Sequence, residues 1–497
     1  MPSALPPSSP FPTLQTSTKI GDGSLYDVKF YPYPTVDGDQ IFAVAGAGDI
    51  FVCRPKLDAD PPYEILRWFK STTNNGNAYK GYGTGQSQDS FNSLAWARDP
   101  ATRKPLLCVA GEKPTQIQIL DVESGARVRS LAGHGNAIND LAVSPLSSSL
   151  LASASADYTV RLWNLEPEYA AQPCVAIFAG EGHRQHVLVS QFHPNGRWML
   201  TAGLDTAVCL WAVPSIEELA RDPAIEGHRA PKTVYYPHFH STEVHADYID
   251  TAVFFGDLIL SRASKDQNSK TVHNAILLWK IDGFDSADAP PAEPPIPSPG
   301  VWTRSSFPHD TRASRGFQRL LTFDMPSTTR FYLRFGLLHA PGMRPVLAMG
   351  NEMTKFHFWD LQKLEEGYGA EERGGKVKKA RGGGRQPRGE AANAVNESNV
   401  HRLGELRRGG SAASDTGVGT PDPSSTSISV PPERKYDLGD PMTPLNAHHT
   451  AVIGKTALSE RKHFAMAQIA WSPDGTWMVG VGDCGMLCIF HRDQSVV

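Results

Sequence analysis

Short runs of β-branched and aromatic residues recur along most of the chain, separated by turn residues. Near the N-terminus SLYDVKFYP precedes IFAVAGAGDIFVCR, and near the C-terminus lies IAWSPDGTWMVGVGDCGMLCIF. Runs of this length and composition favour antiparallel strands joined by tight turns. Seven such units can be recognised, at residues 24–54, 91–122, 138–165, 187–213, 248–281, 331–361 and 469–490. The pattern predicts an all-β protein.

Two of these units share a further pattern of Gly-His, then Asp, then Trp. The two sets are Gly133, His134, Asp157 and Trp163, and Gly182, His183, Asp205 and Trp211. Order and spacing are typical of the WD40 repeat, a unit of roughly 40–45 residues that forms one four-stranded propeller blade. Because a blade leaves both faces uncovered, several must pack into a closed ring. The sequence therefore predicts a seven-bladed WD40 β-propeller with long loop or disordered insertions.

The spacing of equivalent aromatic residues shows where the insertions fall. Trp163 and Trp211 are 48 positions apart, whereas Trp359 and Phe490 are 131 apart (211 − 163 and 490 − 359). We expect the extra residues to leave the ring at about 64–89, 214–247, 283–315 and 365–445. The last of these is rich in Gly, Arg and Ser and has almost no aromatic residues, so we expect most of it to be disordered.

The predicted domain organisation is simple. Residues 1–20 are rich in Pro, Ser and Thr and are expected to start as a flexible tail, although their end, TLQTSTKI, can supply a strand that closes the ring. Residues 21–497 then form one propeller, which the basic and Ser-rich insertion at about 365–445 interrupts.

Composition mainly excludes functions. The chain has 497 residues and a formal net charge of −4, so no global field attracts nucleic acid. One local basic run, GGKVKKARGGGRQPRGE, is either solvated filler or a nuclear import signal or weak DNA contact. The six cysteines are widely spaced without a zinc pattern, and no run is long and apolar enough to span a membrane. We expect buried reduced thiols, no metal and no cofactor.

The histidines are interpreted as structural. Those of the Gly-His…Asp…Trp sets are expected to hydrogen-bond within a blade rather than to catalyse. His238, His240 and His245 in HFHSTEVH have the chemistry of metal ligands, but no second cluster completes a site. This segment is expected to open the fifth unit, in a structural or partner-contacting role. His448 and His449 fall where the Gly-His pair of the seventh unit is expected.

A cluster of aromatic residues emerges when the first strands of the units are aligned on an inward apolar residue. Four positions upstream, the aligned units carry Tyr26, Asn92, Asn139, Leu188, Phe331 and Ala467. This position is expected to face the mouth of the central channel. Tyr26, Phe331 and the following Tyr332 can then line a pocket whose aromatic faces attract a quaternary ammonium group. Ordinary packing between blades is the alternative.

Several longer phrases are more distinctive than a generic WD40 repeat. They are GHGNAIND and LLASASADYTVRLWNL, YPHFHSTEVHADYID, FYLRF and LAMGNEMTKFHFWDL. Each resembles a phrase of the extra sex combs/EED family, the WD40 subunit of Polycomb repressive complex 2. The resemblance covers roughly residues 20–490 and fits a fungal-type member.

This resemblance implies a function. The family binds trimethyl-lysine of the histone H3 tail in an aromatic cage at the channel mouth, and this binding stimulates the methyltransferase subunit that spreads the same mark. Matched phrase by phrase, the cage falls on Tyr26, Phe331 and Tyr332, with Arg334 near the pocket. The bound peptide would act through its higher affinity for the active state of the partner.

The sequence departs from the family at one cage position. Asn92 stands where the family has a tyrosine, and this loss is expected to weaken cation–π attraction by about 0.5–1 kcal/mol. Phe91 or a loop residue is a candidate replacement. Asn139 falls at a polar rim position, where it could bond the peptide backbone.

The resemblance also implies partners and a location. It indicates a nuclear, non-enzymatic protein that scaffolds and allosterically stimulates a SET-domain histone methyltransferase, together with that enzyme's zinc-finger companion subunit. The expected ligand is a trimethylated histone H3 tail peptide, and no membrane is involved. Two alternatives remain: a pure structural scaffold with an eroded cage, which Asn92 favours, and a generic WD40 adaptor such as a ubiquitin-ligase substrate receptor. An enzymatic propeller has the least support, since no nucleophile–base pair or metal cluster is visible.

Overall fold

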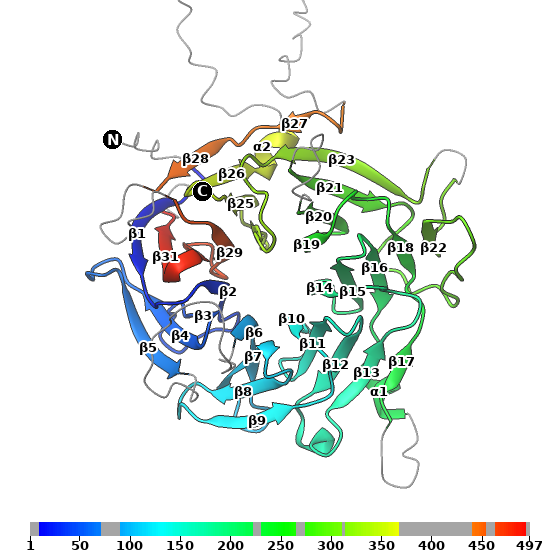
Figure 1. Cartoon of the computed structure of the whole chain (residues 1–497), viewed down its shortest axis with the longest axis horizontal. Helices are drawn as coiled ribbons and strands as arrows, with labels where there is room; N and C mark the ends of the chain where they lie inside the picture. Colours follow the sequence, from blue (N-terminus) through cyan, green and yellow to red (C-terminus); the bar gives the residue numbers. More distant parts are fainter. Residues whose placement is uncertain are drawn as a thin grey trace, which may run out of the picture. The chain divides into compact units, whose positions relative to one another are not determined.

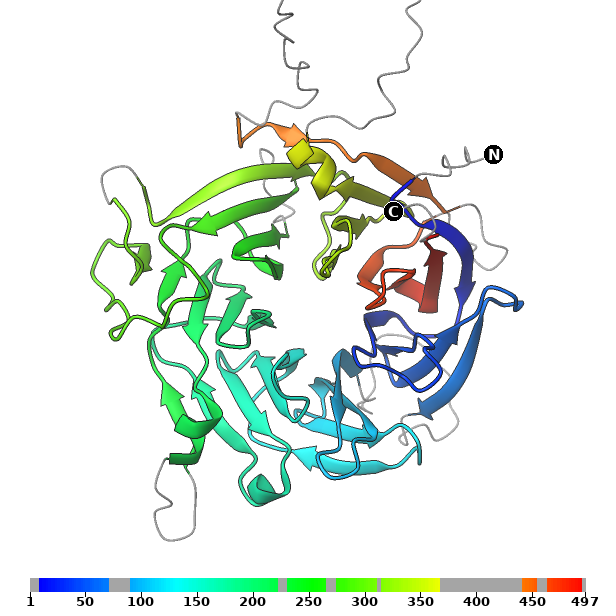
Figure 2. The same ribbon diagram turned by 180° about the vertical axis from the view of Figure 1, so that it is seen from behind.

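Seven sheets of four or five strands surround one axis (Figures 1 and 2). This computed structural model describes residues 9–70, 90–221, 230–264, 274–310, 314–366, 440–453 and 463–493. The predicted all-β, seven-bladed propeller is confirmed. The basic run and most of the predicted insertion at about 365–445 lie outside the described residues.

Each blade runs outward from an inner strand beside the axis, and its consecutive strands are antiparallel. Blade 1 contains β2 (Leu25–Phe30), β3 (Phe42–Gly46), β4 (Asp49–Pro55) and β5 (Tyr63–Lys70). Blade 2 contains β6 (Ser90–Arg98), β7 (Pro105–Lys113), β8 (Ile117–Asp121) and β9 (Arg127–Leu131). The first four strands of blade 3 are β10 (Ile138–Val143), β11 (Leu150–Ser155), β12 (Val160–Asn164) and β13 (Cys174–Phe178). The first four strands of blade 4 are β14 (Val187–Phe192), β15 (Trp198–Gly203), β16 (Val208–Ala212) and β18 (Phe239–Ser241). Those of blade 5 are β19 (Ile249–Phe255), β20 (Leu258–Ala263), β21 (Ala275–Ile281) and β23 (Phe317–Asp324). Blade 6 has β24 (Gly336–Leu338), β25 (Val346–Gly350), β26 (Lys355–Asp360) and β28 (His449–Val452), and blade 7 has β29 (Met466–Trp471), β30 (Trp477–Gly482), β31 (Met486–His491) and β1 (Thr13–Lys19).

The ring is closed by the N-terminal strand. β1 pairs antiparallel with β31, and the register runs from Thr13 opposite His491 to Lys19 opposite Met486. Figure 1 shows this blue strand beside the red strands of the C-terminus. The expectation of a flexible tail over residues 1–20 is therefore corrected for 13–19, and the alternative that TLQTSTKI closes the ring is confirmed. Residues 1–8 lie outside the described part of the chain.

Three of the four predicted insertions lie within a blade and return to the ring. Each follows the third strand of its blade, and part of each adds a fifth strand to the outer edge of the preceding blade. These added strands are β17 (Lys232–Val234) on blade 3, β22 (Thr303–Ser305) on blade 4 and β27 (Pro444–Leu445) on blade 5. Unpaired edge strands invite association, so these short strands protect three edges. The insertion expected at 64–89 is also shorter than predicted, because Tyr63–Lys70 is the outer strand of blade 1.

The short helices accompany two of these insertions. α1 (Ile216–Arg221) follows β16 of blade 4, and α2 (Leu361–Glu366) follows β26 of blade 6. Single turns of 3-10 helix lie at Pro167–Tyr169 and Asp483–Gly485. Both α1 and α2 lie at the outer part of the ring, away from the inner strands (Figures 1 and 2).

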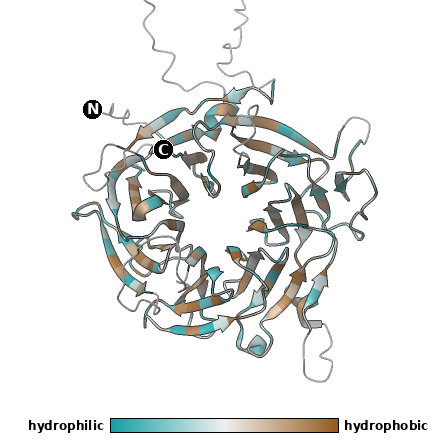
Figure 3. Cartoon of the chain, viewed as in Figure 1, coloured by the Kyte–Doolittle hydropathy of each residue, from teal (hydrophilic) through white to brown (hydrophobic). Residues whose placement is uncertain are grey.

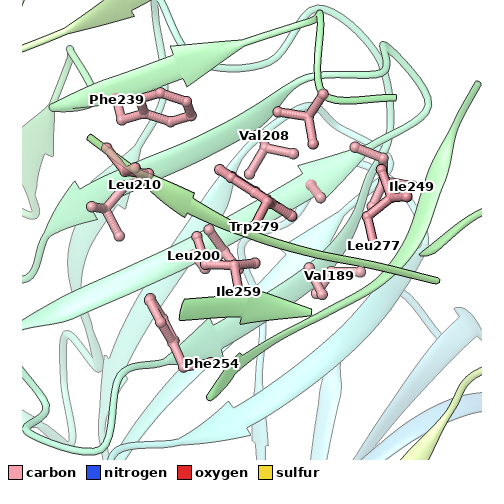
Figure 4. Packing of buried hydrophobic residues seen from close by; sticks show 14 of the residues in the cluster. Val189, Leu200, Val208, Leu210, Phe239, Ile249, Phe254, Ile259, Leu277 and Trp279 are labelled. Atoms are coloured by element: carbon pink, nitrogen blue, oxygen red, sulfur yellow. The ribbon is translucent and has the colours of Figure 1, made fainter. Parts of the chain in front are cut away.

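The core is divided among the contacts between neighbouring blades, each of which has its own buried cluster. Between blades 4 and 5, Leu200 and Leu210 pack against Ile259 and the fully buried Trp279 (Figure 4). Hydrophobic residues concentrate on the strands all around the ring (Figure 3). Because each blade needs two neighbours to cover its faces, the stability of any one blade depends on closure.

The predicted structural histidines do hold strands together. His134 bonds Asp157 at 2.8 Å and Ser153 at 2.7 Å, while the indole N–H of Trp163 donates to the same Ser153 hydroxyl at 2.8 Å. In blade 5, His245 makes the equivalent bond to the Ser261 hydroxyl at 2.7 Å. The indole N–H of Trp279 donates to the same hydroxyl at 2.9 Å, so blade 5 keeps the His, Ser and Trp members of this network.

Two histidine placements are corrected. His238 and His240 do not open blade 5; they lead into and lie on the outer strand of blade 4. His448 and His449 precede and begin the outer strand of blade 6, and the His448 ring nitrogen accepts a hydrogen bond from the Asp360 N–H at 3.0 Å. The sequence pattern assigned these histidines to the start of the following blade. In a WD40 repeat the Gly-His pair follows the outer strand of one blade, whereas these histidines lie at the start of an outer strand.

Candidate aromatic cage

The inner strands share a backbone irregularity at the position singled out from the sequence. In six of the seven blades the pairing of the inner strand with its neighbour shifts by one residue there. The extra residues are Tyr26, Asn92, Asn139, Leu188, Asp250 and Ala467. Such a β-bulge redirects a side chain and is common beside functional sites. Five of these residues are those aligned from the sequence, and Asp250 adds a member from blade 5. In blade 6 the alignment is wrong by two residues, since Leu337 and not Phe335 pairs with Leu347 opposite Trp359.

Small residues opposite the bulges make them possible. Gly203 pairs with Val187 beside the bulge of blade 4, and a Cβ on Gly203 would lie 2.3 Å from the His186 carbonyl oxygen. In blade 7, a Cβ on Gly482 would lie 2.0 Å from the Ala465 carbonyl oxygen. Neither distance can be tolerated, so glycine is required there by close backbone approach.

Blade 6 departs from this pattern. FYLRFGLL was expected to be its inner strand throughout, but β24 begins only at Gly336. The preceding residues approach the axis without strand pairing, and Tyr332 has a positive φ of 62°. Its N–H donates to the Asp250 carboxylate at 3.1 Å, and the Arg334 N–H donates to the Ala467 carbonyl at 2.8 Å. Blades 5 and 7 therefore hold Tyr332 and Arg334 in place of strand pairing, while Glu352 of blade 6 accepts the Arg330 N–H at 2.7 Å.

This segment presents a cluster of aromatic rings. The rings of Phe331 and Tyr332 meet nearly at a right angle (83°), with centroids 4.4 Å apart. Tyr248 adds a third ring, whose centroid lies 5.9 Å from that of Phe331. Phe331 is 39% exposed, while Tyr248 and Tyr332 are half-buried. Perpendicular aromatic faces of this kind can surround a quaternary ammonium group.

Comparison with known proteins places the chain in a family. The family "WD domain, G-beta repeat" matches residues 125–164 and 172–212. The Polycomb protein EED of Chaetomium thermophilum is 32% identical over 94% of this chain and 90% of its own length. The Polycomb protein esc of Drosophila melanogaster is 28% identical over 70% of this chain and 72% of its own length.

The chain belongs to the EED/esc family of Polycomb proteins.

Solved structures agree. The Chaetomium thermophilum Polycomb repressive complex 2 contains a chain that superposes with a TM-score of 0.72 at 31% identity, over 97% of this chain and 98% of that one. A chain of the same complex solved with H3K27me3 and H3K27M superposes equally well, with a TM-score of 0.72 at 31% identity over the same shares. The resemblance to EED/esc proteins is thus confirmed, and with it the expectation that the chain is not an enzyme.

Tyr248 is a further candidate for the aromatic cage, and the sequence analysis did not identify it. It lies in the connection before β19, two residues ahead of the bulge residue Asp250. Alignment on strands cannot place a connecting residue, although its aromatic type within HADYID was visible. The earlier suggestion that a loop residue compensates for Asn92 therefore has a candidate.

Asn92 and Phe91 occupy different environments. Asn92 is the half-buried bulge residue of blade 2, in the expected place. Phe91 is only 4% exposed and packs in the core between blades 1 and 2. The suggestion that Phe91 fills the gap is therefore corrected, since its ring is committed to the core. Asn139 is also buried, and its amide donates to the Val187 carbonyl at 2.8 Å, so it joins blades 3 and 4.

Arg334 spans the ring beneath the aromatic cluster. Its guanidinium lies 5.0 Å from the centroid of the Tyr332 ring, and from blade 6 it donates to Asp140 of blade 3 at 3.2 Å and to the Leu188 carbonyl at 3.0 Å. Burial alone would lower the pKa of Arg334, but Asp140 and other nearby groups raise it above its usual value. Burial likewise raises the pKa of the Tyr332 hydroxyl. A permanent cation thus fixes the inner side of the cluster.

Among the described residues, no group of three or more His, Cys, Asp and Glu side chains is arranged to hold a metal ion. Within the same part of the chain, none of the helices has the length and apolar character needed to cross a membrane.

Proposed function

We propose that this protein is a subunit of a Polycomb-type methyltransferase complex that reads trimethyl-lysine on the histone H3 tail. Tyr26, Phe331 and Tyr332 form the cage in this proposal, with Tyr248 as a further wall, Asn92 at the gap and Arg334 beneath. The observation that carries it is the perpendicular pair Phe331–Tyr332 with Phe331 39% exposed. The pair presents two perpendicular ring faces on a segment whose backbone is bonded from blades 5 and 7, and such faces suit a quaternary ammonium group.

The proposed partners follow from the solved relatives. A chain in the Chaetomium thermophilum complex with H3K27me3 shares this fold over 97% of the present chain. We therefore assign this protein a trimethylated H3 peptide as ligand, a SET-domain catalytic subunit and its zinc-finger companion as partners, and the nucleus as location. The basic run GGKVKKARGGGRQPRGE would add a weak DNA contact or an import signal. Because the chain belongs to the EED/esc family, a generic WD40 adaptor is no longer an alternative.

Calorimetric titration with H3 tail peptides tests the reader function directly. The full chain should bind an H3K27me3 peptide at least about tenfold more tightly than the same peptide without the methyl groups. Phe331→Ala and Tyr332→Ala should each lower this ratio about two- to fivefold or more, because each removes an aromatic face worth about 0.5–1 kcal/mol or more. Trp302→Ala is the matched control, since Trp302 is 65% exposed and lies in the insertion of blade 5. Equal affinity of the wild type for both peptides would exclude the reader.

A second measurement separates the reader from the pure scaffold. The reconstituted methyltransferase complex should be stimulated by the trimethylated peptide with the wild-type subunit and not with Phe331→Ala. Basal activity should be the same with both, because Phe331 lies on a partly exposed segment away from the blade cores. A scaffold with an eroded cage predicts that neither subunit confers stimulation.

A further inference from the structure

The segment that carries Phe331 and Tyr332 is held in an uncommon backbone conformation. This cage arm, residues 327–332, connects β23 to the part of blade 6 that precedes β24 and belongs to no strand. Ser327 and Tyr332, its first and last residues, both have positive φ values, 60° and 62°. Residues with a Cβ rarely adopt the left-handed region of positive φ, so the surrounding structure must impose it.

Two fully buried residues of blade 5 grip the arm. The Arg262 guanidinium donates to the Thr328 carbonyl at 2.7 Å and to the Arg330 carbonyl at 3.1 Å. Its other nitrogen pairs with the Asp250 carboxylate, which also accepts the Tyr332 N–H at 3.1 Å. Three backbone groups within five residues are thus fixed by one ion pair whose side chains have no solvent exposure.

This ion pair is peculiar to the blade beside the arm. Arg262 pairs across the sheet with Thr251, the first residue after the bulge. The residues at the same place in the other blades with a bulge are Ala45, Ala110, Ala154, Ala202 and Val481. A small apolar residue therefore suffices wherever the following inner strand is regular. Arg262 occurs in the one blade whose neighbour presents the cage arm.

We infer that Asp250 and Arg262 are positioning residues that set the geometry of the trimethyl-lysine cage. They contact no ligand; they fix the carbonyls and the N–H that determine where the Phe331 and Tyr332 rings point. Glu352 of blade 6 bonds the Ser327 carbonyl at the other end of the arm, so loss of the Asp250–Arg262 pair frees mainly the Tyr332 end. The rings of Phe331 and Tyr332 then lose their perpendicular arrangement. The inference rests on the proposed function, because it concerns the same site.

The test uses the full chain and two H3 tail peptides, the H3K27me3 peptide and its unmodified counterpart. Arg262→Lys keeps the charge beside Asp250 but lacks the fork that reaches both carbonyls. The double variant Asp250→Asn with Arg262→Gln removes both buried charges together, which avoids leaving one unpaired. Arg344→Lys is the matched control, because Arg344 pairs with the buried Asp360 at 2.6 Å in the same blade as the arm.

The measured quantity is the ratio of the two peptide affinities. A lower folded fraction weakens both affinities equally, so the ratio reports on the cage and not on stability. We expect the ratio to fall at least about fivefold in Arg262→Lys and in the double variant, and to stay at the wild-type value in Arg344→Lys. A wild-type ratio in both blade 5 variants would overturn the inference. No discrimination by the wild type itself would instead overturn the proposed function.

Discussion

At the scale of single residues, the proposed cage takes aromatic side chains from three sources. Tyr26 comes from a bulge in blade 1, Phe331 and Tyr332 from the cage arm, and Tyr248 from the connection before blade 5. Asn92, at the equivalent bulge of blade 2, contributes no aromatic face. Its effect on binding depends on whether the other rings already surround the ammonium group.

Replacement of Asn92 by tyrosine tests the gap. Asn92→Tyr should strengthen binding of the trimethylated peptide by about 0.5–1 kcal/mol, roughly two- to fivefold, because it adds one aromatic face. Asn92→Ala should bind like the wild type. Titration calorimetry of the three proteins measures the difference. Unchanged affinity of a folded Asn92→Tyr protein would mean that Tyr248 already closes the cage.

The pH dependence of stability has a contribution from one buried histidine. Burial, and then the nearby Arg319 and Arg262, lowers the pKa of His245 to about 3. In the unfolded chain the pKa is about 6.5, so between these values the unfolded state binds a proton that the folded state does not. The free energy of unfolding should therefore fall as the pH drops below about 6.5, by up to about 1.4 kcal/mol per pH unit.

Urea unfolding between pH 4 and pH 8 measures this contribution. The substitution His245→Asn keeps a polar partner for Ser261 but cannot gain the proton, so its slope below about pH 6.5 should be smaller by up to one proton. Above pH 7 the two slopes should agree, since His245 is then neutral in both states. Equal slopes below pH 6.5 would contradict the assignment.

At the scale of elements, the bulge and the glycine opposite it form one unit. The bulge redirects a side chain of the inner strand, and the glycine allows the backbone of the next strand to approach it. This arrangement recurs in blades 1, 2, 4 and 7, where Gly46, Gly111, Gly203 and Gly482 face the bulges. Ser155 and Ala263 take this place in blades 3 and 5.

Gly203→Ala should destabilise the protein because its Cβ would meet the His186 carbonyl oxygen at 2.3 Å. We expect a loss of about 1–3 kcal/mol, the usual effect of overpacking. Gly135→Ala is the control, since a Cβ there would meet nothing within 4 Å. That change should be neutral or slightly stabilising. Chemical denaturation of both variants measures the difference, and equal stabilities would argue against the close approach.

At the scale of the whole ring, closure joins the two ends of the sequence. β1 covers the outer edge of β31 with six residue pairs, and Leu14 packs against the core between blades 6 and 7. Without β1, blade 7 would expose an unpaired edge and lose part of its cover. The N-terminal segment is therefore part of the fold and not an appendage.

Deletion of residues 1–19 should lower the Tm by at least about 5 °C and promote aggregation through the exposed edge of β31. Deletion of residues 1–8 alone should leave the Tm unchanged, because the pairing begins at Thr13. Thermal unfolding monitored by circular dichroism, with light scattering for aggregation, compares the two. A wild-type Tm after the longer deletion would show that closure does not depend on β1.

The sequence determined the number of blades, their WD40 character and the position of the bulge in five of the inner strands. These features are repeated and local, since turn residues, alternating apolar positions and Gly-His…Asp…Trp spacing act within about 45 residues. They were enough to name Tyr26, Asn92, Phe331 and Tyr332.

Only the tertiary structure decided how those residues are held and what lies next to them. Tyr248 reaches Phe331, Arg334 reaches Asp140 and Arg262 reaches the cage arm through contacts between residues more than 60 positions apart. The return of the insertions to the edge of the preceding blade is equally long-range. No local sequence pattern specifies such contacts, because they form only when ring closure brings segments distant in the sequence together.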